Sequence, residues 1–139
     1  MAVDYAKKAR QAEKRAQERA INPLESAEQS ALFEWATLME HRAPELRKLY
    51  AIPNGGLRNK RVAVRLTAEG VRRGVPDTCL PVARKGYHGL YIELKRRMGG
   101  RLEPEQEDWI EFLAEQGYKA VVCRGFDEAR AVIENYLGI

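Results

Sequence analysis

Three charged side chains stand at spacings that suit chemistry on a shared reacting group: Asp77, Glu93 and Lys95. Residues 90–95, Leu-Tyr-Ile-Glu-Leu-Lys, alternate apolar and polar, which predicts a strand with its aliphatic residues in a core and Glu93 and Lys95 together on the other face. Asp77 follows a Gly-Val-Pro turn and opens a second predicted strand, residues 78–83, which a short loop returns antiparallel to the first. Such a hairpin places the Asp77 and Glu93 carboxylates side by side.

Two adjacent carboxylates repel one another, and a shared proton or a divalent cation relieves the repulsion. Magnesium suits the pair, because it takes one or two carboxylates and keeps water and phosphate oxygens in the rest of its shell. Lys95 would then orient or deprotonate a water molecule, or stabilise charge developing on a phosphate. The alternative is an ordinary surface Glu-x-Lys pair beside an ordinary Pro-Asp turn. We predict a magnesium- or manganese-dependent site in which Asp77 and Glu93 hold the metal.

Sequence blocks around these residues carry a resemblance to a known family. In order over residues 25–106 they read ESAEQSALFEW, IPNGGLRNKR, LTAEGVRRGVPD, YHGLYIELK and PEQ. The series resembles the virus-type replication-repair nuclease domain, VRR-NUC, of the PD-(D/E)xK superfamily, in its short phage and bacterial form. The resemblance extends over residues 25–139 and implies an α/β fold of one domain, a restriction-endonuclease-like mixed sheet flanked by helices.

The resemblance also implies further site residues. An acidic residue on the first helix of the domain completes the site, which matches Glu25, with Gln29 one turn further on. Glu28 is a rival, because the stretch can be aligned one turn off. Glu25 would bind the metal through water or a second ion, and the backbone carbonyl of Leu94 would be a further ligand. A glutamine early in a later helix lies near the catalytic groups, which matches Gln106.

The charge distribution favours a polyanionic partner. The chain has a net charge of +4, and residues 58–101 hold twelve Lys or Arg against three acids, whereas residues 102–139 hold nine acids against three bases. A positive surface of this kind suits a phosphate backbone, although a solvated basic face is the plainer interpretation. By resemblance, the Asn-Gly-Gly loop at residues 54–56 lies near the substrate. We expect DNA contacts from the following residues: Asn54, Gly55, Arg58, Lys60, Arg61, Arg72 and Arg73.

The chain divides into a basic extension, residues 1–21, and a nuclease-like domain, residues 22–139. The extension has helical composition but few large apolar side chains, so a solvated helix, a disordered arm and a DNA contact all stay open. The first helix of the domain is expected to begin with Asn22 as N-cap and Pro23 at its first position. The alternative to a role of Glu25 in the site is that its side chain only closes a capping box with Asn22. This helix is expected to bury the apolar residues Leu32, Trp35, Leu38 and Met39.

Periodicity predicts the remaining elements. They are a strand at residues 49–52, a basic amphipathic helix at 59–73 packed on the sheet, the hairpin, a helix at 104–117, a strand at 118–124 and a helix at 127–137. Cys79 and Cys123 lie in apolar runs without metal-type spacing, which predicts reduced core thiols. His41 and His88 form neither a zinc site nor a catalytic triad.

Together these features predict a metal-dependent, structure-selective DNA endonuclease. The length of 139 residues suits one domain, and the absence of a signal peptide or a long apolar run predicts a cytoplasmic protein. The resemblance implies that the protein is bacterial or encoded by a phage. One domain offers one site, so by resemblance to dimeric junction resolvases we expect a homodimer acting on branched DNA, such as Holliday junctions in DNA repair. The alternatives are a sequence-specific restriction-type endonuclease and a non-catalytic DNA-binding accessory protein.

Overall fold

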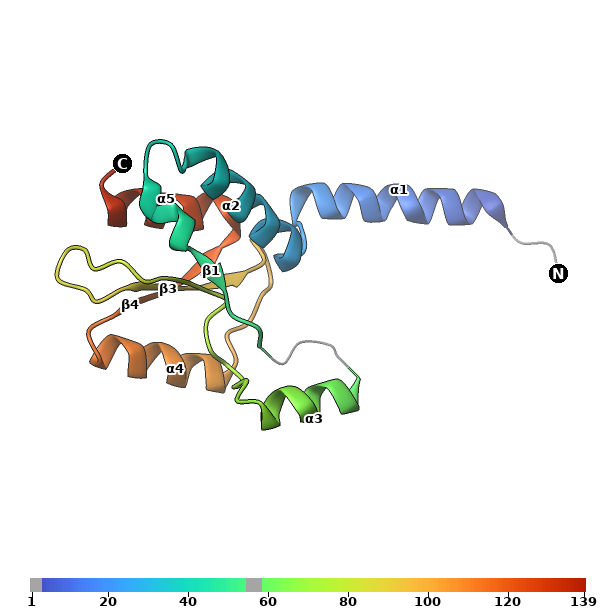
Figure 1. Ribbon diagram of the computed structural model, residues 1–139. Helices are drawn as coiled ribbons and strands as arrows, with labels where there is room; N and C mark the ends of the chain where they lie inside the picture. Colours follow the sequence, from blue (N-terminus) through green and yellow to red (C-terminus); the bar gives the residue numbers. More distant parts are fainter. Residues whose placement is uncertain (1–3, 55–58) are drawn as a thin grey trace.

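A four-stranded mixed sheet forms the centre of the protein (Figure 1). The computed structural model describes residues 4–54 and 59–139, and within them the order of elements is α1 (Tyr5–Ile21), α2 (Glu25–Met39), a 3-10 helix (Pro44–Lys48), β1 (Tyr50–Ala51), α3 (Lys60–Ala68), β2 (Thr78–Leu80), β3 (Leu90–Lys95), α4 (Pro104–Glu115), β4 (Lys119–Arg124) and α5 (Gly125–Leu137). None of these helices is long and apolar enough to cross a membrane.

The strands lie in the order β1-β2-β3-β4. The first three pair antiparallel, and β3 pairs parallel with β4. A parallel pair needs a crossover, which α4 supplies between β3 and β4. The α/β fold class and the mixed sheet flanked by helices are therefore confirmed.

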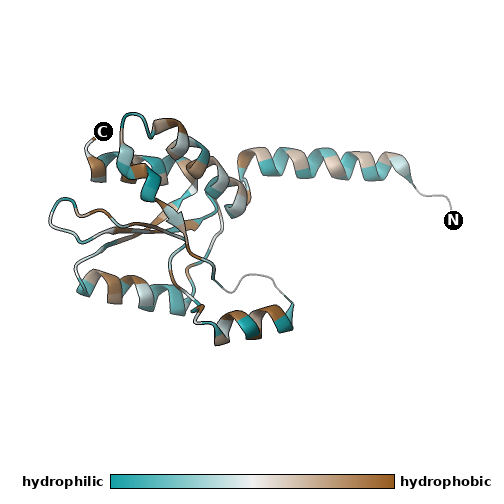
Figure 2. Ribbon diagram, viewed as in Figure 1, coloured by the Kyte–Doolittle hydropathy of each residue, from teal (hydrophilic) through white to brown (hydrophobic). Residues whose placement is uncertain are grey.

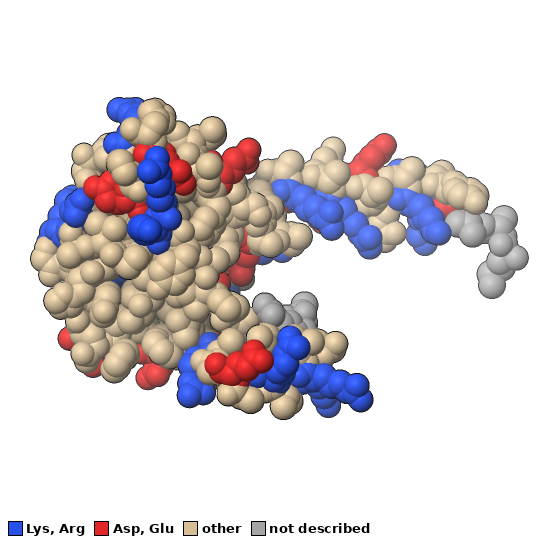
Figure 3. Space-filling model, in the orientation of Figure 1, with Lys and Arg blue, Asp and Glu red and all other residues tan. Residues whose placement is uncertain are grey.

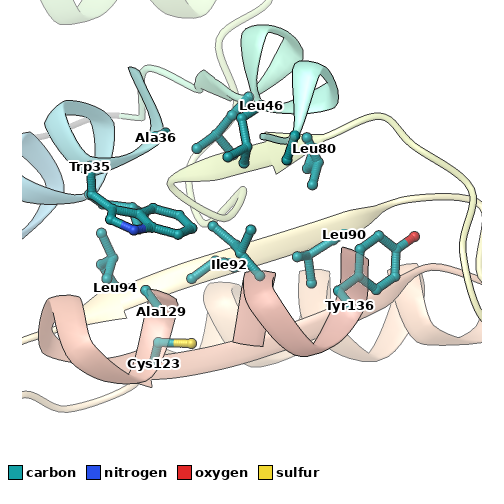
Figure 4. Close-up of a cluster of buried hydrophobic side chains, with 14 residues drawn as sticks. Trp35, Ala36, Leu46, Leu80, Leu90, Ile92, Leu94, Cys123, Ala129 and Tyr136 are labelled. Atoms are coloured by element: carbon teal, nitrogen blue, oxygen red, sulfur yellow. The ribbon is translucent and has the colours of Figure 1, made fainter. Parts of the chain in front are cut away.

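Helices cover the sheet on both faces. In Figure 1, α2 and α5 lie over one face and α4 lies over the other. The core between the sheet and α2 and α5 contains Leu90, Ile92 and Leu94 of β3, packed with Trp35 and Tyr136 (Figure 4). Along each covering helix, hydrophobic residues alternate with hydrophilic ones, as expected for elements with one buried face (Figure 2).

Two of the predicted strands are shorter than expected, whereas β4 agrees closely with the prediction. The strand predicted at residues 78–83 ends at Leu80, because Pro81 has no N–H to donate and Val82 N–H turns back to the carbonyl of Leu80 at 2.9 Å. β1 has two residues where four were expected. Cys79 and Cys123 are free and buried, as predicted.

The start of α2 corrects one prediction. Asn22 is the C-cap of α1, and its N–H donates to the carbonyl of Glu18 at 2.8 Å. The N-cap of α2 is Leu24, so Glu25 forms no capping box with Asn22. Leu38 is also not a core residue: its side chain is exposed, and Ala36 takes the buried place on that turn.

The helix predicted at residues 59–73 is shorter and packs differently than expected. Asn59 caps it by accepting from Val62 N–H at 2.9 Å, and the helix ends at Ala68, before Gly70 with its positive φ of 102°. No residue of α3 is buried. The expected packing of α3 on the sheet was therefore wrong, since its short apolar side is only half-covered and the helix lies beside the sheet (Figure 1).

Candidate active site

The register of the β2–β3 hairpin brings Asp77 and Glu93 together. Thr78 pairs with Ile92, so the next antiparallel position sets Asp77 opposite Glu93. The backbone N–H of Leu94 donates to Asp77 Oδ2 at 2.7 Å, which holds the aspartate at the end of the ladder. The structure thus places the two carboxylates side by side, as the predicted hairpin requires.

Asp77 is positioned by the turn before it and by the loop after β1. Gly74 has a φ of +91°, and a Cβ at this position would lie 2.7 Å from the backbone of Glu105, so only glycine lets the turn approach α4 this closely. The side-chain amide of Asn54 donates to Asp77 Oδ1 and to the carbonyl of Val75, both at 3.2 Å. Asn54, predicted as a DNA contact, therefore orients Asp77.

Glu93 is buried and has two neighbours on one of its oxygens. Its Oε1 accepts from Gln106 Nε2 at 2.7 Å and lies 3.5 Å from Lys95 Nζ. Gln106 in turn accepts the N–H of Glu103 at 2.9 Å through its own Oε1, so one side chain both caps α4 and reaches the site. The other oxygen, Glu93 Oε2, is buried without a hydrogen-bond partner among the described residues.

Burial dominates the electrostatics of the two carboxyl groups. It raises the pKa of Glu93 to about 8, with the charge of Asp77 adding to the effect and Lys95 opposing it. Burial also raises the pKa of Asp77, against the lowering effect of hydrogen bonds from Leu94 N–H and Asn54. Without a cation, the pair is therefore expected to retain a proton near neutral pH.

These observations fit a small divalent cation held by few protein ligands. A buried carboxylate oxygen that has no partner in the described part of the chain, beside a second carboxylate, is an unsatisfied anionic site. Among residues 4–54 and 59–139, no three His, Cys, Asp or Glu side chains converge as a complete cage. Magnesium needs only one or two carboxylates, so Asp77 and Glu93 suffice in type and number. The carbonyl of Leu94 as a further ligand stays a prediction.

The two candidate acids on α2 have different surroundings. Glu28 is 2% exposed, and its carboxylate accepts from Arg97 Nε at 2.7 Å and from Phe126 N–H, at the start of α5, at 2.6 Å. Its charge is used to join α2, α5 and the loop after β3. Glu25 lies exposed in the first turn, and its charge is among the causes that raise the pKa of Glu93. Glu28 is therefore engaged in contacts between elements, and Glu25 at the site stays a prediction.

The remaining predicted residues lie around this centre. Gln29 is half-buried, one turn after Glu25 on α2. The basic residues predicted to contact DNA are exposed on α3 and on the segment that follows it, namely Lys60, Arg61, Arg72 and Arg73. Arg73 Nε lies 3.9 Å from the exposed Glu105 carboxylate. Gly55 and Arg58 lie outside the described residues.

Sequence reasoning missed the residues that join the site to the N-terminal helices. The Asn22 side chain donates to the carbonyl of Met98 at 3.0 Å and accepts from Met98 N–H at 3.1 Å. Arg97 pairs with Glu28 from the same loop. No local pattern signals these contacts, because each joins segments about seventy residues apart.

A mixed sheet that sets Asp77 opposite Glu93, with Lys95 two residues further along the strand, has the arrangement of PD-(D/E)xK nuclease folds. The family model described as "VRR-NUC domain" matches residues 11–127, a range that begins within α1. A solved structure described as "VRR_NUC domain protein" is 30% identical, with a TM-score of 0.72, and the match covers 84% of this chain and 90% of that one. The chain belongs to the VRR-NUC family. No curated protein matches it significantly.

Proposed function

We propose that the protein is a divalent-metal-dependent endonuclease that hydrolyses phosphodiester bonds of DNA, with magnesium or manganese as cofactor. The observation that carries the proposal is the buried oxygen of Glu93, beside Asp77 and Lys95, which has no hydrogen-bond partner in residues 4–54 and 59–139. Membership of a family with a nuclease-type fold supports it. Family membership also implies that the partner is DNA.

The side chains of the site would divide the work of hydrolysis. Asp77 and Glu93 would hold the cation, which when bound supplies a Lewis acid and lowers the pKa of water. Gln106 keeps the Glu93 carboxylate in one orientation through its 2.7 Å hydrogen bond. In the reaction the water oxygen would form a new P–O bond and release a proton to solvent, while one ester P–O bond breaks and the leaving alkoxide takes up a proton from solvent.

Lys95 would act on the reacting phosphate or on the attacking water. Its side chain is buried against the site, and its ammonium lies 3.5 Å from Glu93 Oε1. A fixed positive charge in a water-poor site stabilises a developing negative charge by about 2 to 4 kcal/mol. Asp77 and Glu93 would therefore bind the metal ion, whereas Lys95 would stabilise the transition state of hydrolysis.

A nicking assay tests the proposal. We expect the purified protein to nick supercoiled DNA with magnesium or manganese and to be inactive in EDTA. Lys95→Met keeps most of the buried side-chain volume and removes the charge, so it should lose at least about 100-fold in rate. Lys85→Met is the matched control, because Lys85 lies in the loop between β2 and β3, where it donates to Asn135 at 3.2 Å.

The outcomes separate the alternatives. Full activity in EDTA, or in Lys95→Met, would remove the proposed mechanism. A few discrete fragments from linear DNA would favour the restriction-type enzyme. Binding without cleavage under every metal condition would favour the accessory protein.

We further propose that the enzyme is a homodimer that cuts branched DNA, in the manner of a junction resolvase acting in DNA repair. Paired cuts across a symmetric junction need two sites related by a twofold axis. The acidic outer side of α4 offers a surface for a second copy, with a shallow pocket of about 390 Å³ lined by Asp108, Trp109, Glu111, Phe112 and Glu115. Phe112 is 51% exposed there, and its ring lies 6.2 Å from that of Trp109, so the two aromatic side chains form an apolar centre on this surface.

Light scattering and substrate choice test this assembly. We expect a dimer at micromolar concentration that cleaves a four-way junction in preference to a 5′-flap, and a Phe112→Asp variant that is monomeric. A strict monomer that prefers the flap would exclude the resolvase-like activity and leave the nuclease proposal standing.

A further inference from the structure

Helix α1 projects from the domain without packing on it. It runs over Tyr5–Ile21, and none of its residues is buried (Figure 1). Helices in proteins owe most of their stability to tertiary contacts along one face. The absence of such a contact within the described residues indicates that α1 binds another molecule.

The side chains of α1 define the chemistry of that partner. At 3.6 residues per turn, all six basic side chains fall on roughly one half of the helix circumference: Lys7, Lys8, Arg10, Lys14, Arg15 and Arg19. The opposite half carries mostly alanines, with Tyr5, Glu13 and Gln17 among them. One acid, Glu18, lies within the basic half, 4.0 Å from Lys14. Figure 3 shows lysine and arginine side chains gathered along the side of α1 that is turned toward α3. A cationic face of this length complements a phosphate backbone.

The C-terminal end of α1 is hydrogen-bonded to the loop beside the candidate active site. Asn22, which ends the helix, makes two hydrogen bonds with Met98 through its side chain. Its carbonyl accepts from Arg96 Nη2 at 2.6 Å. Since Arg96 directly follows Lys95, these contacts fix the base of α1 at the rim of the site.

Helix α3 is joined to the same site from the other side. Asn54 precedes it in the chain and Asp77 follows it, and the two are hydrogen-bonded at 3.2 Å. α3 exposes the basic side chains of Lys60, Arg61 and Arg65. In Figure 3, a wide hollow separates α3 from α1.

We propose that α1 and α3 are the two basic walls of a groove that takes a DNA duplex, with the Asp77–Glu93 site at its base. The inference rests on the proposed function, and it identifies the surface of the protein that binds the DNA substrate. With a rise of 1.5 Å per residue, α1 is about 25 Å long. At about 3.4 Å per base pair, it spans roughly seven base pairs beside the scissile bond.

The six basic residues of α1 therefore contribute affinity at a distance from the reacting bond. The test replaces all six with Gln, which keeps helix propensity near that of Lys and Arg. Binding to a 30-base-pair duplex is measured by fluorescence anisotropy in EDTA, as a function of salt. We expect at least tenfold weaker binding at 100 mM salt and a log–log salt slope smaller in magnitude by at least two. In cleavage assays the loss should appear as a raised KM.

Two further variants serve as controls for the effect of charge on α1. Lys85→Gln with Lys119→Gln removes charge near the loop between β2 and β3 and the start of β4, away from the proposed groove, and should bind as the wild type does. Glu13→Gln with Glu18→Gln removes both acidic side chains of α1, and this variant should bind DNA at least twofold more tightly. Because none of these α1 residues is buried, thermal melting should match the wild type.

The outcomes distinguish this inference from the proposed function. A wild type that cleaves DNA, together with a six-substitution variant of equal affinity and salt slope, overturns the groove and leaves the nuclease. Dimeric wild type and monomeric variant in light scattering would show instead that α1 binds a second copy. A wild type that neither binds nor cleaves DNA overturns both proposals.

Discussion

The buried carboxyl group of Glu93 should make the stability of the metal-free protein depend on pH. Its pKa is raised from 4.5 to about 8 by burial and by Asp77, so between these pH values the folded state holds a proton that the unfolded state has released. The free energy of unfolding therefore falls as the pH rises through this window and levels off above about pH 8. Each pH unit with a difference of one proton is worth about 1.4 kcal/mol, which sets an upper limit of about 5 kcal/mol on the loss.

The substitution Glu93→Gln removes this titration and keeps the shape of the side chain. The new amide oxygen can accept from Gln106 Nε2, as Glu93 Oε1 does at 2.7 Å. The new amide nitrogen can donate to Asp77, so no buried polar atom needs to lose a partner. We expect the variant and the wild type to have similar stability near pH 5. Near pH 9, the variant should be more stable by about 3 to 5 kcal/mol.

Urea denaturation in EDTA at pH 5, 6, 7, 8 and 9 measures the effect. Glu34→Gln is the control, because Glu34 is exposed on α2 and its removal should leave the pH curve of the wild type unchanged. Adding magnesium at pH 8 should stabilise the wild type, since the ion binds the folded state, and should have little effect on Glu93→Gln. Parallel pH curves for the wild type and Glu93→Gln would refute the inferred environment of this carboxyl group.

Three other substitutions probe the surroundings of the site. Asp77→Asn should weaken magnesium binding at least tenfold in titration calorimetry, and unchanged affinity would contradict its assignment as a ligand. Gln106→Leu should lower both stability, by about 1 to 3 kcal/mol in urea, and nicking activity, because Glu93 loses a buried donor; wild-type behaviour in both assays would exclude that positioning role. Glu28→Ala should cost about 2 to 3 kcal/mol of stability by leaving Phe126 N–H without its acceptor, and loss of magnesium binding by the folded variant would instead place Glu28 at the site.

The adjacency of the two carboxylates was predictable from local pattern. Alternation along residues 90–95 determines which side chains share a face, because the side-chain period of a strand is two. The Gly-Val-Pro-Asp turn marks where the neighbouring strand begins, and the short connection requires an antiparallel return. These signals act over a few residues, so they predict that Asp77 and Glu93 lie on neighbouring strands. The register that sets the two residues opposite each other depends on further contacts.

The burial of Glu93 and Lys95 was not predictable in the same way. Alternation predicts one apolar face and one polar face, yet β3 is covered on both sides and these two residues are 1% and 6% exposed. The cover over the polar face includes Gln106 at the start of α4, which contacts Glu93 from thirteen residues away. Burial raises the pKa of Glu93, so the electrostatic character of the site depends on packing that local pattern does not report.

The errors at the helices have a similar cause. Asn22 has the residue type of an N-cap, and Pro23 follows it as if to open a helix. The structure uses Asn22 to end α1 and to bind Met98, a contact across seventy-six residues. For α3, periodicity correctly indicated a helix with an apolar side. It could not show whether another element covers that side.

The register of the hairpin links the fold to the chemistry. A shift of β2 by one residue against β3 would set Asp77 opposite an aliphatic residue and would turn every side chain of the strand to the other face. Two features oppose such a shift: the hydrogen bond from Leu94 N–H to Asp77 Oδ2 and the close contact of Gly74 with Glu105. Both features involve the turn at residues 74–77, which leads into β2. The residues of this turn therefore also position the carboxylates. The Gly-Val-Pro-Asp block therefore has a structural reason independent of any metal, and a Gly74→Ala variant should lose the carboxylate pair together with the stability of the turn.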